Sequence, residues 1–233
     1  MLLLETVFED LLHLFYPHQC SGCASDALEK DQILCYRCLN NLPKTGMQDI
    51  QNNMVERVFS GRLPIHAAHS EFFFSKGKLV QQLLHQIKYK GNQQLGIYLG
   101  EMLGQSLSNN KRFANINAII PMPMLKKKAI TRGYNQAMII SKGVQKITGI
   151  PIVENLIVRT KKTATQTKKS RSERWQNVNG TFEINDGESW KGKHVLLIDD
   201  VLTTGATLEA CGNTLLNISG LTLSLAVLAF AAK

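Results

Sequence analysis

The sequence predicts an α/β fold, a parallel sheet flanked by helices, with a small helical and cysteine-rich subdomain ahead of it. Short apolar runs alternate along the chain with stretches of helical periodicity, which is the pattern of βαβ units. The run from Val195 to Ile198 has no polar alternation, and this is typical of a parallel strand covered on both faces. Two Cys-x-x-Cys pairs lie between Cys20 and Cys38, a spacing that predicts a small metal-held subdomain.

The composition indicates a globular protein with anionic partners. A chain of 233 residues with 44% hydrophobic content can form one α/β domain with an appendage. Its formal net charge of +9 favours polyphosphates or nucleic acid without selecting one of them. The first fifteen residues are apolar but include Glu5, Glu9 and Asp10, and no apolar run is long enough to span a bilayer. We therefore expect a cytoplasmic protein without a signal peptide.

The N-terminal stretch, residues 2–16, has the periodicity of an amphipathic helix that ends at Pro17. Its polar face carries acidic residues rather than Lys or Arg, so we expect a helix that docks on the protein rather than on a membrane surface. Its apolar positions are Leu3, Leu4, Val7, Phe8, Leu11, Leu12 and Phe15.

The four cysteines that follow predict a structural zinc site. Two Cys-x-x-Cys pairs can close a tetrahedral site, and four ligands leave no open position for catalysis. A pair of disulfides is the alternative, although nothing in the sequence indicates an oxidising compartment. His18 is a possible replacement ligand. The predicted ligands are Cys20, Cys23, Cys35 and Cys38.

The predicted domain organisation has three parts. Residues 1–43 contain the helix and the zinc finger, residues 44–64 form a polar linker with a possible short helix at 49–59, and residues 65–233 form the α/β domain. Within that domain we expect strands at 67–74, 118–120, 156–159, 195–198 and 221–232, and helices at 78–89, 96–108, 136–146 and 208–216. Cys211, in the last of these helices, is expected to be a buried structural thiol.

Three basic segments could face an anionic ligand. Residues 88–91 end a predicted helix, where they could either complement its dipole or face a phosphate. Residues 124–137 form a basic loop after a strand end, the edge of an α/β sheet where ligands bind, and carry Lys126, Lys127, Lys128 and Arg132. Residues 160–174 have little to bury and should be mobile without ligand, although a plain solvated loop or a nucleic-acid tether would look the same.

The most informative stretch is VLLIDDVLTTGAT, from Val195 to Thr207. Asp199 and Asp200 stand at the carboxyl end of the apolar run, and a Thr-rich turn with Gly205 leads into a helix. A helix start offers unpaired N–H groups and a positive dipole end, so this loop can hold a phosphate. Adjacent carboxylates suit a ligand that also carries hydroxyls and a divalent metal. The alternative is that the aspartates only cap the turn.

The whole string resembles the PRPP-binding motif of type I phosphoribosyltransferases. The resemblance implies that Asp199 and Asp200 bind the ribose hydroxyls, and that the basic loop at 124–137 and residues 160–174 are the pyrophosphate loop and the flexible catalytic loop. It assigns the 5-phosphate to Thr203, Thr204, Gly205, Ala206 and Thr207.

Taken over its whole length, the chain resembles the ComF (ComFC) family of competence-associated phosphoribosyltransferase-like proteins. The resemblance rests on the cysteine pairs, PMP with RGYNQA, the PRPP motif and an array comprising Arg159, Thr163, Gln166, Arg174, Asn177 and Phe182. One departure is Thr165, where family members often carry proline, which affects the expected shape of the loop.

The resemblance implies transfer of a phosphoribosyl group from PRPP to an acceptor that the sequence does not identify. The transfer would need Mg2+ and would release pyrophosphate. The expected catalytic residues are Asp199, Asp200, Lys161 and Arg174, and those expected to bind the leaving group are Lys127, Arg132, Lys161 and Arg174. A non-catalytic, PRPP-liganded competence factor that binds single-stranded DNA is the alternative. Binding to a phosphate backbone would weaken steeply with salt, whereas binding of PRPP in a pocket would need Mg2+ and both aspartates.

Overall fold

The computed structural model describes residues 18–26, 28, 29, 31–108, 110–160 and 181–232. The predicted helix at residues 2–16 and most of the predicted catalytic loop, including Lys161 and Arg174, lie outside the described residues.

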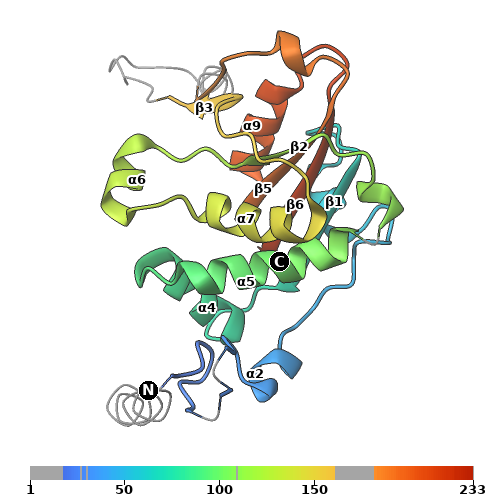
Figure 1. Cartoon of the computed structure of the whole chain (residues 1–233). Helices are drawn as coiled ribbons and strands as arrows, with labels where there is room; N and C mark the ends of the chain where they lie inside the picture. Colours follow the sequence, from blue (N-terminus) through green and yellow to red (C-terminus); the bar gives the residue numbers. More distant parts are fainter. Residues whose placement is uncertain (1–17, 27, 30, 109, 161–180, 233) are drawn as a thin grey trace, which may run out of the picture.

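A four-stranded parallel sheet forms the centre of the molecule (Figure 1). The strand order is β1-β6-β5-β2, and in the middle of the sheet Leu196 pairs with Ser224 on one side and Ile119 on the other. The strands are β1 (Ala67–Phe73), β2 (Ala118–Pro121), β5 (His194–Leu202) and β6 (Thr222–Phe230). The predicted parallel sheet is confirmed.

Helices cover both faces of this sheet. Leu196 and Ile198 of β5 belong to the core on the face of α4 (Leu79–Tyr89), α5 (Gln93–Ser108) and α7 (Gln136–Thr148). Val195 and Leu197 belong to the core on the opposite face, with α3 (Met54–Phe59) and α9 (Ala206–Leu215). Successive strand residues point to opposite faces, so the apolar run is buried on both, as its composition predicts.

Glycines bring α5 and α7 together. A Cβ on Gly100 would clash with the carbonyl oxygen of Ile140, and one on Gly143 would clash with that of Ile97. Small residues permit this backbone approach, and the helix pair forms a continuous layer under the sheet (Figure 1).

Three local predictions differ from the structure. Strand β5 continues to Leu202 because it pairs with β6 along its whole length, so both aspartates lie within the strand rather than after it. The expected basic loop contains a helix, α6 (Lys126–Arg132), which is rich in good helix formers and ends at Gly133 with φ of +84°. A separate antiparallel hairpin pairs β3 (Ile157–Arg159) with β4 (Phe182–Ile184), a strand that we did not predict.

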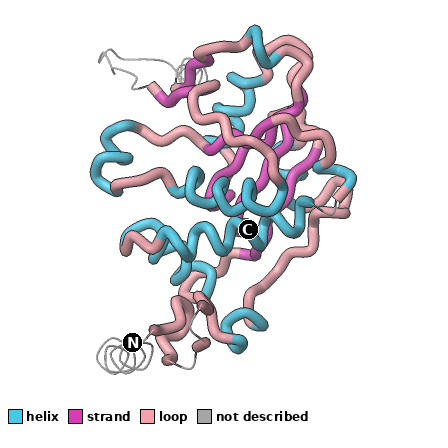
Figure 2. Tube along the Cα trace, viewed as in Figure 1, coloured by secondary structure: helices cyan, strands magenta, loops and turns pink. Residues whose placement is uncertain are grey.

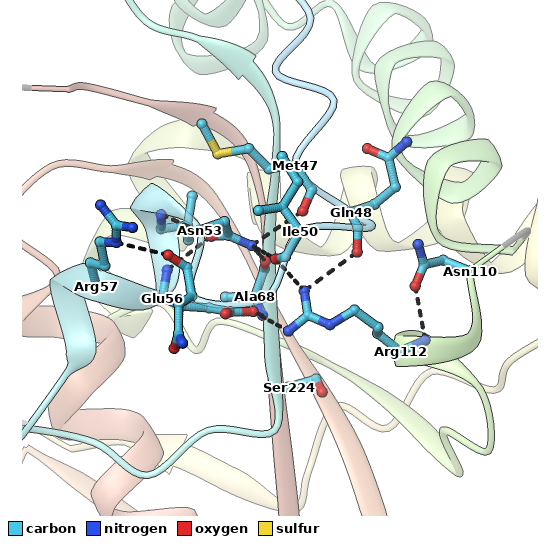
Figure 3. A network of polar contacts seen from close by, with 12 residues as sticks. Met47, Gln48, Ile50, Asn53, Glu56, Arg57, Ala68, Asn110, Arg112 and Ser224 are labelled. Carbon is cyan, nitrogen blue, oxygen red and sulfur yellow. Dashed lines mark hydrogen bonds and ion pairs between the residues drawn. The ribbon is translucent and has the colours of Figure 1, made fainter.

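Residues 44–64 pack against the sheet and include α3, within the range predicted for a short helix. Asn53 is 4% exposed, and its side-chain oxygen caps the start of α3. Arg112 Nη2 lies 2.5 Å from Glu56 Oε1 in the same network (Figure 3). The side-chain amide of Asn53 donates to the carbonyl oxygens of Met47, Ile50 and Ala68. The domain boundaries at 43/44 and 64/65 stay a prediction.

Candidate functional site

The two aspartates of β5 point to different faces of the sheet, because adjacent residues of a strand alternate. Asp200 lies on the α4 face, where its Oδ2 atom is 2.9 Å from Nζ of Lys88. Asp199 lies on the α9 face, where its charge raises the pKa of the buried thiol of Cys211, in addition to the larger effect of burial. The acid pair therefore has two distinct environments.

Burial raises the pKa of Asp199 to about 7, and the neighbouring charge of Asp200 adds to this effect. A hydrogen bond from the Asp200 N–H to Asp199 Oδ1, 2.8 Å long, acts in the opposite direction, as do the charges of Lys88 and Arg159. This carboxyl group therefore binds its proton more tightly than an exposed aspartate does. A ligand that donates hydrogen bonds to it would favour the ionised form.

The turn after β5 is held by α3. Gly205, with φ of +78°, begins α9, and a Cβ there would lie 3.0 Å from the Phe59 ring and 3.1 Å from Val58. The glycine is thus favoured by tight packing as well as by backbone conformation. Arg62 Nη1 donates to the carbonyl oxygen of Thr204 at 3.3 Å, and the same guanidinium pairs with Glu209. A small cavity touches Asp199, Thr203, Thr204, Gly205, Ala206 and Thr207, so the structure brings these predicted residues together.

The end of α4 connects the acid pair to α6. Lys88 pairs with Asp200, the guanidinium of Arg132 lies over the Tyr89 ring at 5.4 Å from its centroid, and the Tyr134 hydroxyl donates to the carbonyl oxygen of Ile87. The sequence left two roles open for Lys88, dipole complement and phosphate contact. Lys88 lies in the last turn of α4, where a cation complements the dipole, and its ammonium pairs with one of the two aspartates predicted to bind ribose.

The expected pyrophosphate residues on α6 are placed by this contact. Arg132 ends the helix and packs on Tyr89, next to Lys88 in sequence, while Lys127 lies in the first turn. The C-terminal end of α6 therefore lies beside the end of α4, whose Lys88 reaches Asp200. The leaving-group role of Arg132 and Lys127 stays a prediction.

The hairpin β3–β4 pairs the two ends of the predicted catalytic loop. Arg159 is opposite Phe182 in the ladder, and its guanidinium lies 5.4 Å from the ring centroid. Arg159 Nε is buried and has no hydrogen-bond partner among the described residues. The residue also lines a cavity of about 510 Å³ that extends to Pro121, Tyr134 and Lys142. It combines a positive charge near Asp199 with an unused buried donor.

The four predicted zinc ligands form a cluster in a stretch that is mostly loop (Figure 2). The Sγ atoms of Cys20, Cys23, Cys35 and Cys38 lie within 4.8 Å of one another. The five cysteines of the chain, all within its described part, are free, so the disulfide alternative is not seen. His18 contacts the carbonyl oxygen of Gln32 at the edge of this stretch.

Cys20 has the environment of a thiolate. Burial raises the pKa of Cys20, but hydrogen bonds from backbone N–H groups outweigh it and bring the value to about 6. Two of these hydrogen bonds are donated to Cys20 Sγ by Cys35 N, at 3.2 Å, and by Gly22 N, at 3.3 Å. Burial and the neighbouring thiols raise the pKa of Cys38. A bound cation would remove this asymmetry, because metal ligation deprotonates coordinated thiols.

Comparison with known proteins shows what the C-terminal part of the chain is similar to. Residues 131–233 match the family described as phosphoribosyl transferase domain. This part of the chain is therefore similar to a phosphoribosyl transferase domain. The match begins after β2, yet β2 pairs with β5 in the same sheet, so the fold extends beyond the matched residues.

The curated relatives are competence and DNA utilization proteins. Competence protein F of Haemophilus influenzae is 31% identical over 131 residues, which are 54% of this chain and 57% of that protein. DNA utilization protein YhgH of Escherichia coli K12 is 25% identical, over 58% of this chain and 60% of that protein. Competence protein ComFC of Bacillus subtilis is 24% identical, over 61% of this chain and 56% of that protein. The predicted resemblance is confirmed, and the chain spans less than two thirds of each relative.

Solved structures give weaker matches. Glutamine phosphoribosylpyrophosphate amidotransferase from B. subtilis has a TM-score of 0.38 and 18% identity, over 56% of this chain and 25% of that chain. Adenine phosphoribosyltransferase from Leishmania tarentolae has a TM-score of 0.39 and 13% identity, over 81% of this chain and 94% of that chain. At such scores the fold class rests on the sheet and on the domain match. None of the helices in the described part combines enough length and apolar character to span a bilayer.

The sequence analysis did not identify the residues that contact the site from distant parts of the chain. Phe59 and Arg62 fall in the predicted linker, where only the apolar spacing of Val55 and Phe59 indicates a packed helix. Lys88 was recognised as basic, but its partner follows from the fold. Arg159 was included only as part of the family array, because a single arginine at a strand end gives no local signal.

Proposed function

We propose that the protein binds PRPP and transfers its phosphoribosyl group to an acceptor, with release of pyrophosphate. The observation that supports this best is the acid pair on β5 followed directly by a turn at the start of α9. The match to a phosphoribosyl transferase domain includes both. Asp199 and Asp200 would accept hydrogen bonds from the ribose hydroxyls, while residues 203–207 would hold the 5-phosphate at the helix N-terminus.

The chemistry of such a site is mostly electrostatic. As pyrophosphate leaves, the anomeric carbon gains positive charge, and carboxylates held near the ribose would stabilise it. Bound Mg2+ would supply the charge that neutralises the pyrophosphate oxygens. Lys127, Arg132, Lys161 and Arg174 are the proposed contacts to the leaving group, and of these Lys161 and Arg174 lie outside the described residues.

We also propose that the cysteine cluster holds one structural zinc ion. Zinc–sulfur bonds of about 2.3 Å in a tetrahedron separate the sulfur atoms by about 3.8 Å. The Cys23 and Cys35 Sγ atoms are 3.7 Å apart, so the spacing fits. Metal analysis should find one zinc per chain, with chelation unfolding residues near the cluster rather than the sheet. Protein that folds fully without metal would exclude this role.

A second candidate is a non-catalytic competence factor that binds single-stranded DNA and uses PRPP as a ligand. The net charge of +9 and the names of the relatives, competence protein and DNA utilization protein, support it. Both candidates share the PRPP site. They differ in whether pyrophosphate is released when an acceptor is present.

The test of the proposed function is calorimetric titration of PRPP in the presence and absence of Mg2+. The double variant Asp199→Asn, Asp200→Asn should lose binding, because amides keep the size but remove the charge. The control is Asp186→Asn, which neutralises an exposed aspartate near β4. Equal binding by the parent and double variant would overturn the assignment. Pyrophosphate release with a panel of bases and amines then separates the enzyme from the binding protein, whose single-stranded DNA affinity should fall steeply with salt.

A further inference from the structure

The ion pair between Lys88 and Asp200 occupies a group that the proposed ligand needs. The Nζ and Oδ2 atoms are 2.9 Å apart, and the two side chains are 25% and 13% exposed. Asp200 lies within β5, whereas Lys88 comes from the last turn of α4. A partly shielded pair of this kind is held by charge rather than by packing, so a ligand with matching groups can replace one partner.

We infer that Lys88 is a substrate-binding residue that leaves Asp200 when PRPP binds and moves to the pyrophosphate group. This inference rests on the proposed function. It makes Lys88 a further residue, beside the proposed leaving-group contacts, that distinguishes PRPP from ribose 5-phosphate at the same site.

The chemistry of the two partners requires the exchange. A carboxylate only accepts hydrogen bonds, and a ribose diol brings two donors, so Asp200 can satisfy its charge with the ribose. An ammonium has three donors and no acceptor, so the displaced Lys88 needs another anion. In PRPP that anion is the pyrophosphate on the anomeric carbon, next to the 2-hydroxyl. Ribose 5-phosphate carries only a hydroxyl there and leaves the lysine without a partner.

The surroundings of Lys88 allow a short movement in the required direction. The end of α4 is fixed to the segment around α6 by the Tyr134 hydroxyl on the Ile87 carbonyl and by Arg132 on the Tyr89 ring. The backbone of Lys88 is therefore held between Asp200 and the segment proposed to bind pyrophosphate. Its four-carbon stem is flexible, so the ammonium can move from one anion to the other without movement of the helix.

The exchange predicts opposite effects of the lysine on the two ligands. Ribose 5-phosphate must break the pair and gains nothing for Lys88, so the lysine weakens its binding. PRPP breaks the same pair but returns a charge-assisted contact, which contributes more than a partly exposed ion pair. Lys88 should therefore raise the selectivity ratio, which is the dissociation constant for ribose 5-phosphate divided by that for PRPP.

The test measures that ratio by calorimetry with Mg2+, using PRPP and ribose 5-phosphate on the full chain. Lys88→Met keeps the stem and removes the charge. We expect its affinity for PRPP to fall about tenfold. Its affinity for ribose 5-phosphate should rise about twofold to fivefold, because Asp200 is then unpaired. The control is Lys90→Met, which makes the same change in net charge two residues away, on a side chain that lines the cavity beside the cysteine cluster. The control should keep the parent's ratio.

The outcomes separate the inference from the proposed function. A parent protein that binds neither ligand overturns the proposed function and this inference with it. The inference alone is overturned if the parent binds PRPP and the selectivity ratio of Lys88→Met is less than about threefold below that of the parent. A rise in affinity for both ligands also overturns it, because the lysine would then only block the site. Should the methionine variant fail to fold, Lys88→Gln gives the same readout, and Lys88→Arg should recover most of the selectivity.

Discussion

The two faces of β5 hold the candidate site in different ways. On the α3 side, Phe59 and Val58 pack against Gly205, so the turn is held by shape. On the α4 side, Lys88 pairs with Asp200 across a partly exposed contact, so this carboxylate is held by charge. An apolar contact cannot bind a phosphorylated ligand, whereas one partner of an ion pair can be replaced by a charged group of the ligand. The comparison indicates that α3 maintains the turn and that α4 responds to what binds there.

The largest expected effect comes from disturbing the shape-dependent side. Gly205→Ala places a methyl group 3.0 Å from the Phe59 ring on a residue with φ of +78°. We expect a loss of about 2–3 kcal/mol, because backbone strain and a close contact add together, and a fall in melting temperature of at least about 4 °C. Thermal unfolding checks the loss of stability, and PRPP titration should show weaker binding.

The matched control for this variant is Gly149→Ala. Gly149 also has a positive φ, +71°, but a Cβ there would meet nothing within 4 Å. It should lose only the cost of the left-handed conformation, about 1 kcal/mol. Equal losses at the two positions would show that Phe59 and Val58 give way easily, and that α3 does not fix the turn.

The parts of the site that could be predicted from the sequence are those encoded by neighbouring residues. The apolar run of β5, its two aspartates and the Thr-Gly turn are contiguous, so period and residue type were sufficient. The same holds for the cysteine cluster, whose two Cys-x-x-Cys pairs are close in sequence and whose four thiols lie within 4.8 Å of one another. The strand was nevertheless predicted too short, because the aspartates interrupt the apolar pattern while their backbone continues to pair with β6.

The support of the site could not be predicted because it joins residues far apart in the chain. Phe59 under Gly205 and Lys88 on Asp200 depend on how α3 and α4 cross the sheet, which no local pattern specifies. The segment around α6 was predicted to be a loop because its Lys and Arg residues follow a strand end and resemble a solvated, ligand-facing loop. Lysine and arginine are also good helix formers, and an exposed helix needs few apolar residues to form beside a packed neighbour.

A second, intermediate effect concerns Asp199. Burial and the charge of Asp200 raise its pKa from 3.8 to about 7, so the folded protein binds this proton more tightly than the unfolded chain does. Stability linked to this group is therefore present below about pH 4 and is lost as the pH rises toward 7. Asp199→Asn removes the cost of the charge at this partly buried position and can still accept the hydrogen bond from the Asp200 N–H.

We accordingly expect Asp199→Asn to melt at least about 2–4 °C above the parent at pH 8, corresponding to about 1 kcal/mol, while losing PRPP affinity. The difference between variant and parent should shrink as the pH falls to 4. Melting curves across this range check the sign. A variant less stable than the parent at pH 8 would mean that the charged carboxylate is well compensated in the free protein, and that the site is not strained.

The smallest expected effect on stability is that of Lys88→Met. Exposed or partly exposed ion pairs contribute about 0–1 kcal/mol, so the melting temperature should fall by no more than about 4 °C. Removing the lysine also removes one of the charges that lower the pKa of Asp199, so that pKa should rise further. The pH dependence of PRPP affinity should then shift to higher pH, since more of the free protein carries a neutral Asp199. A loss of stability as large as that of Gly205→Ala would contradict the contrast between the two faces of β5, because α4 would then maintain the strand end as firmly as α3 maintains the turn.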